Sequence, residues 1–526
     1  MRKTFAFITA ALMLLSLMPF GIAATTTPEG IPVSSSAEFA AMAADGTYYL
    51  AADIVLMETY ETTFTGTLDG NGHKITVAMA AFKEFNGTVK NLTIDGDVTD
   101  SAAFARLATG QITVENVTNN ANVKGKDASS SYGGGIVAQV VIGDGKGTAT
   151  FTNCVNNGTV DSVKIAGGIV AQSCAYQNEI HNCINNGSIS GGTYVAGIVG
   201  NAGNATNATS DFHITNCINN GEIFSSATAT AGAAGIIARC STKDQILEYI
   251  VENCANNGKV TINSTTTDGD YAIYAGGVCG YMLGDAGNAV RHCYNTADVS
   301  VTSVLTTSAG AKASYAAGVL AYANGGTFEL TDCYSTGKIT CTDTRVYHNY
   351  TTANAAAVGI NPSSSGSGLF ENNWYLEGSC EIGEKNGAMG DCAQTFTLDE
   401  LKNGTLCTKI NENCVRAQEY QNGAYYYMDG QECTLYDLVG KTAAPEFKII
   451  ETEATTKVET TAKKQEDTEP ETTAEATQAV ADDTTAAVVI DTTKTDEKKG
   501  GCGSAVGLFA VTALIPAAFA LRKKKE

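Results

Sequence analysis

Three aspartates near the start of the repetitive part of the chain come closest to a catalytic set. Asp69, Asp95 and Asp97 could act as general acid and base, or supply oxygen ligands for calcium. Each of them stands next to a glycine in a turn-like context, where an aspartate usually hydrogen-bonds to nearby backbone. We therefore predict that these carboxylates stabilise turns, and we assign no catalytic residue, no metal ligand and no cofactor-binding residue.

The basic residues of the repetitive body are scattered. A lyase mechanism needs a base that abstracts a proton, yet the arginines fall at unrelated positions of the repeat: Arg106, Arg239, Arg291, Arg345 and Arg416. His73 lies in a turn region, and three further histidines stand at different offsets from the repeat cysteines: His181, His213 and His292. These histidines are not expected to stack into a metal site.

Cysteine is the residue that recurs most regularly. Its spacing drifts through 29, 34, 37, 39 and 40 residues along one series: Cys154, Cys183, Cys217, Cys254, Cys293 and Cys333. The residues three before and six after each of these cysteines are apolar, as Phe151 and Val160 are around the first. Leu92 and Val117 take the cysteine place in two earlier units. A fixed motif with drifting spacing predicts one structural unit that carries a variable loop.

The same units contain a glycine-rich strand. It reads Ala-Gly-Gly-Ile-Val at 166–170 and recurs in related form at 134–137, 196–199, 234–237, 275–278 and 317–320. Three short strands separated by turns, repeated about nine times, are typical of the coils of a solenoid. The predicted fold class is therefore all-β, a right-handed parallel β-helix over residues 60–380.

An asparagine precedes the cysteine position in most units: Asn116, Asn153, Asn182, Asn216 and Asn253, followed by His292 and Asp332. Equivalent positions of stacked coils lie about 4.8 Å apart, so identical amides can hydrogen-bond along the stack. Asparagine also tolerates the left-handed backbone of a sharp bend. We interpret this column as structural and not as a sugar-binding feature.

The chain has 16 cysteines, which an exported protein would normally pair in disulfides. For the repeat cysteines we favour stacked buried thiols, because a fixed inward position suits a small apolar filler. Neighbouring coils are nonetheless close enough for vertical disulfides. Four cysteines beyond the repeats are better disulfide candidates, with three possible pairings: Cys392, Cys407, Cys414 and Cys433. No Cys-x-x-Cys pair occurs, so no cysteine metal site is predicted.

Two stretches of the sequence resemble known β-helix families. Residues 65–76, Thr-Gly-Thr-Leu-Asp-Gly-Asn-Gly-His-Lys-Ile-Thr, and residues 87–96 are similar to the first coils of pectin-lyase-like β-helices. The later units resemble the GLUG-type repeats of bacterial surface proteins, whose Gly-Gly-Ile-Val followed by Cys-Tyr-Asn-Thr-Gly is nearly present at 276–296. The resemblance covers roughly residues 45–380. It implies an architecture that hosts both enzymes and binding proteins.

The two ends of the chain indicate export and tethering. Arg2 and Lys3 precede an apolar run that ends in small residues, which is the layout of a signal peptide over 1–24. Residues 505–521 are uncharged and a basic cluster follows them, which predicts a transmembrane helix as anchor within 500–526, with its basic end in the cytoplasm. No LPxTG pentapeptide precedes this segment, so sortase attachment is not supported.

Three segments lie between these ends and the repeats. Residues 25–59 are expected to form a short N-terminal cap with a helix over 35–44, since Ser35 stands three residues before Glu38. Residues 381–448 are expected to form a small C-terminal cap region, with a helix that begins after Thr397 and aromatic residues at 425–427 that cover the last coil. Residues 449–499 are rich in threonine and glutamate and lack aromatic residues, which predicts a disordered stalk.

Charge and the missing catalytic set narrow the function. A formal net charge of −22 argues against nucleic-acid binding. The sequence favours a noncatalytic, adhesin-like cell-surface protein that binds an extracellular glycan or a host or matrix protein through its lateral face and variable loops. These loops are 141–149, 201–211, 262–272 and 302–314. The alternative is a carbohydrate-active enzyme, a polysaccharide lyase or glycoside hydrolase. A groove lined by two carboxylates would favour the enzyme, and a flat face of threonine and asparagine would favour the binding protein.

Overall fold

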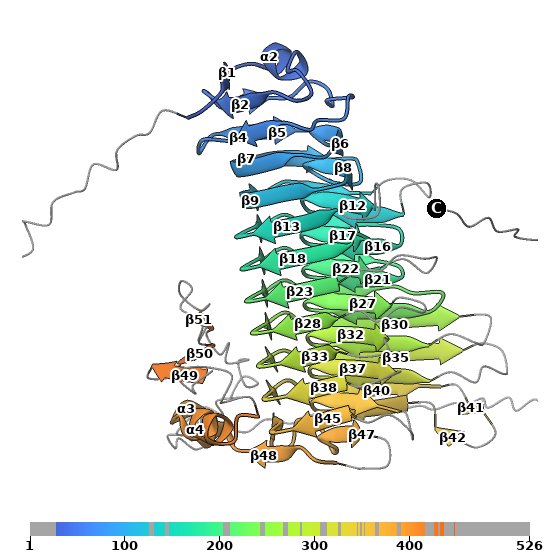
Figure 1. Cartoon of the computed structure of the whole chain (residues 1–526). Coiled ribbons are helices and arrows are strands. Elements are labelled where there is room, and N and C mark those ends of the chain that lie inside the picture. Colours follow the sequence, from blue (N-terminus) through green and yellow to red (C-terminus); the bar gives the residue numbers. More distant parts are fainter. Residues whose placement is uncertain are drawn as a thin grey trace, which may run out of the picture. The chain divides into compact units, whose positions relative to one another are not determined.

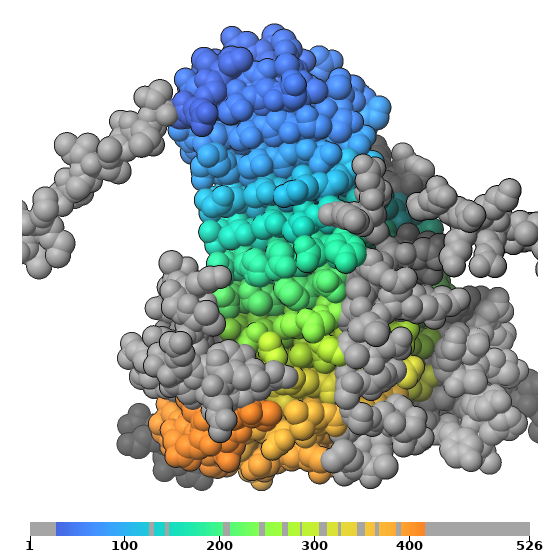
Figure 2. Space-filling view, in the orientation of Figure 1, coloured from blue at the N-terminus to red at the C-terminus, as the bar shows by residue number. Residues whose placement is uncertain are grey.

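The computed structural model describes residues 28–125, 131–141, 147–203, 211–241, 248–266, 272–283, 287–305, 313–324, 328–344, 346–347, 350–351, 353–362, 368–386, 391–415, 426–429, 432–435 and 446–447. Within them the chain is mostly β, and its strands wind into coils that stack in parallel (Figure 1). This confirms the predicted all-β solenoid of parallel strands. Figure 2 shows the successive coils as stacked layers, from blue to orange.

A typical coil contains five short strands. The coil that holds Cys183 runs through β18 (Gln177–His181), β19 (Ile184–Asn185), β20 (Ile189–Gly191), β21 (Tyr194–Ala196) and β22 (Val199–Ala202). Each strand pairs in parallel with its equivalent in the next coil. Sequence analysis predicted three strands for each repeat. The difference arises because bends at the asparagine before the cysteine and at Asn-Asn-Gly divide one expected strand into three pieces.

The strands form three main sheets. The ten-stranded sheet contains β6 (Phe82–Phe85), β8 (Ala105–Thr109), β12 (Val137–Val141), β17 (Val170–Ser173), β22, β27 (Ile237–Ser241), β32 (Cys279–Leu283), β37 (Leu320–Asn324), β44 (Gly359–Asn361) and β47 (Glu384–Asn386). The seven-stranded sheet contains β11 (Tyr132–Gly134), β16 (Ile165–Gly167), β21, β26 (Ala231–Ala234), β31 (Ile273–Gly276), β36 (Ser314–Ala317) and β43 (Ala353–Ala356).

The 29-stranded sheet holds the remaining three columns of each coil. Its first column runs through β1 (Ile31–Val33), β2 (Thr47–Leu50), β4 (Thr67–Asp69), β7 (Thr88–Val98), β9 (Ile112–Asn119), β13 (Thr148–Thr152), β18, β23 (Asp211–Thr215), β28 (Tyr249–Glu252), β33 (Asn288–Arg291), β38 (Phe328–Thr331) and β45 (Gly368–Glu371). The second includes β14 (Val155–Asn156), β19, β24 (Ile218–Asn219), β29 (Ala255–Asn256), β34 (Tyr294–Asn295), β39 (Tyr334–Ser335), β46 (Trp374–Leu376) and β48 (Gln394–Phe396). The third includes β10 (Asn122–Lys124), β15 (Val160–Asp161), β20, β25 (Ile223–Ser225), β30 (Val260–Thr266), β35 (Val299–Leu305) and β40 (Ile339–Asp343). Because β1 and β2 already pair in this sheet, the parallel stack begins before the predicted residue 60.

The interior consists of apolar columns, one residue for each coil. The predicted inward column is confirmed, because its members are all buried: Leu92, Val117, Cys154, Cys183, Cys217, Cys254, Cys293 and Cys333. Its cysteines are free thiols, and the backbone N–H of Cys183 lies 3.4 Å from the Sγ of Cys217 in the next coil. Burial raises the pKa of the Cys154 and Cys183 thiols well above the usual range. The repeat cysteines therefore act as apolar fillers, as predicted.

Asparagine ladders run along the stack. The asparagines before the cysteines have left-handed backbones, with φ of 54° at Asn153 and 56° at Asn182, and the Nδ2 of Asn182 donates to the Oδ1 of Asn153 over 3.1 Å. A second ladder, the first asparagine of each Asn-Asn-Gly, is fully buried. In it the Nδ2 of Asn185 donates to the Oδ1 of Asn219 over 2.7 Å and to the carbonyl of Gly187. The structural interpretation of the asparagines is confirmed.

Short helices lie at both ends of the stack. The N-terminal helix α2 (Ser36–Ala40) is shorter than predicted, and the backbone N–H of Glu38 donates to the Oγ of Ser35. At the other end α3 (Leu398–Lys402) begins with the predicted capping box between Thr397 and Glu400. α4 (Thr405–Glu412) follows, and together these helices lie beside the last coils (Figure 1). They enclose a second apolar core with the stack: Tyr294, Tyr334, Trp374, Phe396, Leu401, Leu406 and Ile410.

Several predictions fall on segments outside the described residues: the signal peptide 1–24, the stalk 449–499 and the anchor 500–526. The side chains of Tyr425, Tyr426, Tyr427 and Cys433 also fall there. Among the described residues, no helix is long and apolar enough to span a membrane.

Candidate functional site

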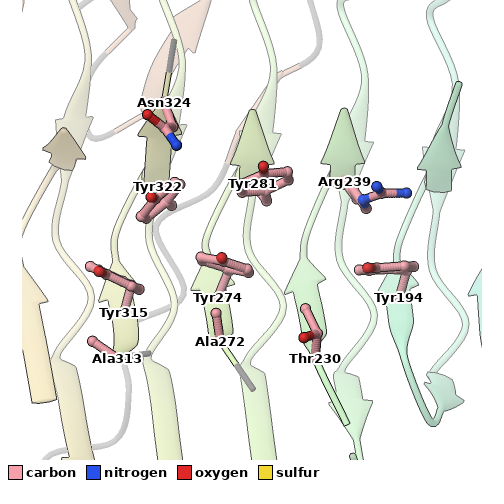
Figure 3. A pocket seen from close by; sticks show the side chains of 10 residues that line it. All are labelled: Tyr194, Thr230, Arg239, Ala272, Tyr274, Tyr281, Ala313, Tyr315, Tyr322 and Asn324. Atoms are coloured by element: carbon pink, nitrogen blue, oxygen red, sulfur yellow. The ribbon is translucent and has the colours of Figure 1, made fainter. Parts of the chain in front are cut away.

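Two rows of outward-facing aromatic side chains meet at the bend between the seven-stranded and the ten-stranded sheets. Tyr274 on β31 and Tyr315 on β36 are register partners in one sheet. Tyr281 on β32 and Tyr322 on β37 are register partners in the other. Figure 3 shows the two rows lying side by side, with Tyr194 and Arg239 continuing them along the stack. We call these six residues the tyrosine groove.

The rings are packed within and across the rows. Tyr274 and Tyr315 stack at 5.7 Å between centroids with 12° between ring planes, and Tyr281 and Tyr322 stack at 5.4 Å and 29°. Across the bend the centroids of Tyr274 and Tyr281 are 4.8 Å apart, as are those of Tyr315 and Tyr322. Residues on adjacent sheets can touch in this way only because the bend is concave on its outer side.

The concave bend depends on small residues. A Cβ at Gly276 would lie 1.8 Å from the carbonyl oxygen of Cys279, so the chain folds back tightly here, and the neighbouring coils place only alanine at the equivalent position, in Ala234 and Ala317. A Cβ at Gly277 would lie 2.5 Å from the Oδ1 of Asn295, a member of the buried asparagine ladder. The same close approach joins Gly168 to Asn185. The buried ladder therefore lies directly behind the floor of the groove.

Arg239 closes one end of the aromatic rows. It is the register partner of Tyr281, its Cζ lies 5.1 Å from the ring centroid of Tyr194, and its Nη1 donates to the Oδ1 of Asn201 over 3.3 Å. Between Tyr194 and Tyr274 the outward position is Gly232, which leaves a gap in the row beside the guanidinium. A positive charge and an open gap thus lie next to the tyrosine rings.

The hollow has a volume of about 470 Å³ and is lined, besides the six groove residues, by Thr230, Ala272, Ala313 and Asn324. Burial raises the pKa of Tyr281 to about 12 and raises that of Tyr274 further still. The phenols are therefore neutral at physiological pH and present O–H groups beside apolar ring faces. Among the described lining residues none is acidic, so the hollow offers no carboxylate for acid–base chemistry or for calcium.

Of the three candidate aspartates, only Asp69 bonds to turn backbone as predicted, whereas Asp95 and Asp97 lie within strand β7 and contact neighbouring side chains. Asp69 accepts from the backbone N–H of Asn71 and from the Nδ2 of Asn91. Asp95 accepts from the Nδ2 of Asn120 at 2.9 Å and pairs with Lys74 at 3.0 Å, which lowers its pKa. Asp97 accepts from the Nδ2 of Asn122. These carboxylates lie on the 29-stranded sheet and do not line the groove.

The histidines occupy separate places. His73 contacts Asp53 at 3.1 Å on the surface. His181 and His213, from adjacent coils, both contact Glu179, at 3.1 and 3.3 Å. His292 is buried elsewhere beside Asp332.

Among the described arginines, Arg239 has a role in the groove that the sequence analysis missed. Arg106 pairs with Asp100 at 2.6 Å and Arg291 with Glu252 at 3.3 Å, while Arg345 and Arg416 lie outside the described residues.

The tyrosine groove itself had a signal in the sequence. Tyrosines flank the glycine-rich strand at both ends in two successive repeats, as Tyr-Ala-Gly-Gly-Val-Cys-Gly-Tyr at 274–281 and Tyr-Ala-Ala-Gly-Val-Leu-Ala-Tyr at 315–322.

The predicted disulfides of the cap do not form as a set. Cys392 is an exposed free thiol, and each of the three possible pairings of the four cap cysteines requires it. Cys407 and Cys414 are buried whereas Cys392 is exposed, so the pairing predicted for Cys392 is not found among the described residues. The variable loops also remain a prediction, since most of their residues fall outside the described part of the chain: 142–146, 204–210, 267–271 and 306–312.

Comparison with known proteins adds little to this geometry. No family model and no curated protein matches the sequence. A solved structure from Bacteroides ovatus, named "putative immunoglobulin A1 protease", is 14% identical, and the match covers 71% of this chain and 86% of that chain. The TM-score of 0.26 is too low to support an argument about function.

Proposed function

We propose that this chain is a noncatalytic binding protein that holds an extended glycan in the tyrosine groove. The observation that carries the proposal is the double row of tyrosine rings along the outer bend, with Arg239 at its end. Aromatic faces can cover the apolar face of a sugar ring, while the phenol oxygens at their edges hydrogen-bond to its hydroxyls. The site therefore combines the two kinds of contact that a sugar needs.

The direction of the groove suits a polymer. Equivalent side chains recur along the stack at a spacing of about 4.8 Å, so similar contacts repeat from coil to coil. A chain of sugars that runs along the stack would meet the same kind of surface at each unit. A protein partner would need a broader interface, of about 800 Å² on each side, and the groove is a narrow hollow at a bend.

The lining separates this proposal from the enzymatic alternative. Glycoside hydrolases work with a pair of carboxylates, and the described lining of the groove contains none. The face is also not the flat surface of threonine and asparagine that sequence analysis associated with a binding protein. Its aromatic lining supports binding on different grounds, because it offers stacking surfaces without a carboxylate.

The cellular setting belongs to the same proposal. A signal peptide, a stalk over 449–499 and a membrane anchor over 500–526 would place the groove outside the cell, as in the GLUG-type surface proteins that the repeats resemble. An adhesin-like role, with an extracellular glycan as partner and the membrane as anchor, follows from that arrangement. These features rest on the sequence.

A glycan array probed with residues 25–448 tests the proposal, followed by titration calorimetry with the best ligand. Replacing Tyr281 and Tyr322 together by alanine should weaken binding by at least about tenfold, since losing two stacking faces costs more than about 1.4 kcal/mol. The control is Tyr176→Ala, which removes an exposed tyrosine outside the groove. Unchanged affinity of the double variant would reject the groove, and binding only to protein ligands would reject the glycan.

A further inference from the structure

The column of residues before the repeat cysteines changes type near the C-terminal cap. It is asparagine up to Asn253, then His292 and Asp332, and asparagine again at Asn372. All of these residues share the left-handed backbone, with φ of 51° at His292 and 56° at Asp332. Asparagine serves the same bend in the other coils. Histidine and aspartate also tolerate this backbone, so these two coils differ from the others in what packs against the side chains and not in the bend.

Cys414, which follows α4, lies against these two residues. The Nε2 of His292 is 3.7 Å from the Oδ2 of Asp332, and the Sγ of Cys414 is 3.7 Å from the same oxygen. One ligand atom from each of the three residues lies within 4.8 Å of the other two. His292 and Asp332 are fully buried, and Cys414 is 9% exposed. A nitrogen, an oxygen and a sulfur ligand thus converge beneath the cap.

The separations are close to those of ligands around one metal ion. Zinc bonds of about 2.0–2.1 Å to nitrogen or oxygen and about 2.3 Å to sulfur, at tetrahedral angles, place ligand atoms about 3.3–3.6 Å apart. Two of the three separations, at 3.7 Å, need only a slight closure to reach that range, and the third, between His292 and Cys414, lies within 4.8 Å. The mixture of imidazole, thiolate and carboxylate suits zinc and does not suit calcium, which takes oxygen ligands.

The surroundings hold Asp332 in a ligating orientation. Its Oδ1 accepts from the Nδ2 of Asn372 at 2.5 Å, the backbone N–H of Val415 donates to both carboxylate oxygens at 3.2 and 3.3 Å, and Oδ2 lies toward His292 and Cys414. Asn372 is fixed in turn, because its Oδ1 accepts from the Nε1 of Trp374 at 2.9 Å. Hydrogen bonds of this kind are what orient the ligands of protein metal sites.

We propose that His292, Asp332 and Cys414 bind a zinc ion that fastens the C-terminal cap to the β-helix. Binding releases the thiol proton, and the thiolate, the carboxylate and a neutral imidazole then balance the double charge of the ion inside a buried site. The described side chains supply three of the four ligands that zinc usually takes. Two ligands come from the coils and one from the cap, so the ion joins segments that are far apart in the sequence.

Zinc titration of the full chain tests this proposal. The protein is stripped with EDTA, kept reduced, and titrated with zinc chloride by calorimetry, with metal content measured by mass spectrometry. His292→Asn restores the residue type of the other coils, and Cys414→Ser removes the sulfur at the edge of the site. Each variant should bind zinc at least about 100-fold more weakly than the wild type, and zinc should raise the melting temperature of the wild type alone.

The matched control is Cys392→Ser, which removes an exposed thiol of the cap region and should leave zinc binding unchanged. Cobalt gives an independent readout, because thiolate ligation produces a charge-transfer absorption band that Cys414→Ser should abolish. A wild type that retains no zinc at micromolar concentrations overturns the proposal. So does a folded Cys414→Ser variant that binds zinc as tightly as the wild type, and that variant decides the matter if His292→Asn does not fold.

Discussion

Tyrosine has two different roles in this protein, and its place in the coil decides which one it takes. Tyr294 and Tyr334 stack at 4.8 Å with 7° between ring planes, and both are buried under the C-terminal cap. Tyr274 and Tyr315 stack in nearly the same way, yet they lie half-buried in the tyrosine groove. Stacking along the coils thus occurs both under the cap and in the groove, and only the pair in the groove is accessible to a ligand.

Glu384 gives the fold a pH dependence at the scale of one residue. It is 1% exposed on β47, and its Oε1 accepts from the Nδ2 of Asn373 at 2.8 Å. Burial, reinforced by the nearby Asp391, raises its pKa from 4.5 to about 8. The folded chain therefore keeps a proton that the unfolded chain loses above pH 4.5, so this contribution to stability is complete below pH 4.5 and declines until about pH 8.

We expect Glu384→Gln to remove this decline, because an amide of the same shape cannot ionise. At pH 8 the variant should exceed the wild type in free energy of unfolding by about 1–4 kcal/mol, and near pH 4.5 the two should converge. Chemical denaturation at a series of pH values measures the difference. Glu377→Gln, at an exposed position of the same region, serves as control and should follow the wild type. Parallel pH profiles of Glu384→Gln and the wild type would contradict the prediction.

At the scale of the elements, the bend between β31 and β32 links the inside of the coil to its outer face. The glycines of the bend have no side chain, so the strand can turn sharply and the buried asparagine ladder can approach it from within. The outward residues on both sides of the bend then converge, which brings Tyr274 and Tyr281 together. The buried asparagine ladder packs against the inner side of the bend, and the tyrosine groove lies on its outer side.

The two asparagines of one Asn-Asn-Gly turn should differ sharply in their effect on stability. Asn185 is fully buried, and alanine there would leave the Nδ2 of Asn156, the Oδ1 of Asn219 and the carbonyl of Gly187 without this partner. We expect Asn185→Ala to cost about 2–4 kcal/mol. Asn186→Ala is the control at the adjacent exposed ladder, where water replaces the lost amide and the cost should stay below about 1 kcal/mol. Equal losses in urea denaturation would contradict the buried ladder.

At the scale of the whole molecule, the chain divides into a stack that carries the groove and an end that we propose as its tether. A chain truncated after Lys448 should be secreted in soluble, folded form, because the stack and its cap helices lose no described packing partner. The full chain should remain with the cell envelope and be released by mild protease that cleaves between 450 and 499. Fractionation and mass spectrometry of the released fragment measure both outcomes. Full-length chain in the medium would contradict the tether.

The sequence by itself determined the inward column, the asparagine bends and the parallel stacking of the coils. A residue at a fixed offset from Cys183 meets its own equivalent one coil away, so periodicity alone predicts the inward column, the left-handed asparagine bends and the parallel stacking. The capping box at Thr397 was equally predictable, because its partners are three residues apart. These contacts join residues that are close in the sequence, or residues at equivalent positions of successive repeats.

Only the tertiary structure decided which residues of different type become neighbours. Tyr274 touches Tyr281 because the bend between their sheets is concave on its outer face. The repeat pattern does not show whether such a bend is concave or convex. Cys414 meets His292 and Asp332 because α4 folds back along the stack, a docking that depends on the shape of the second apolar core. Periodic sequence fixes contacts between equivalent positions, whereas contacts between unlike positions depend on bend angles and on how the cap packs.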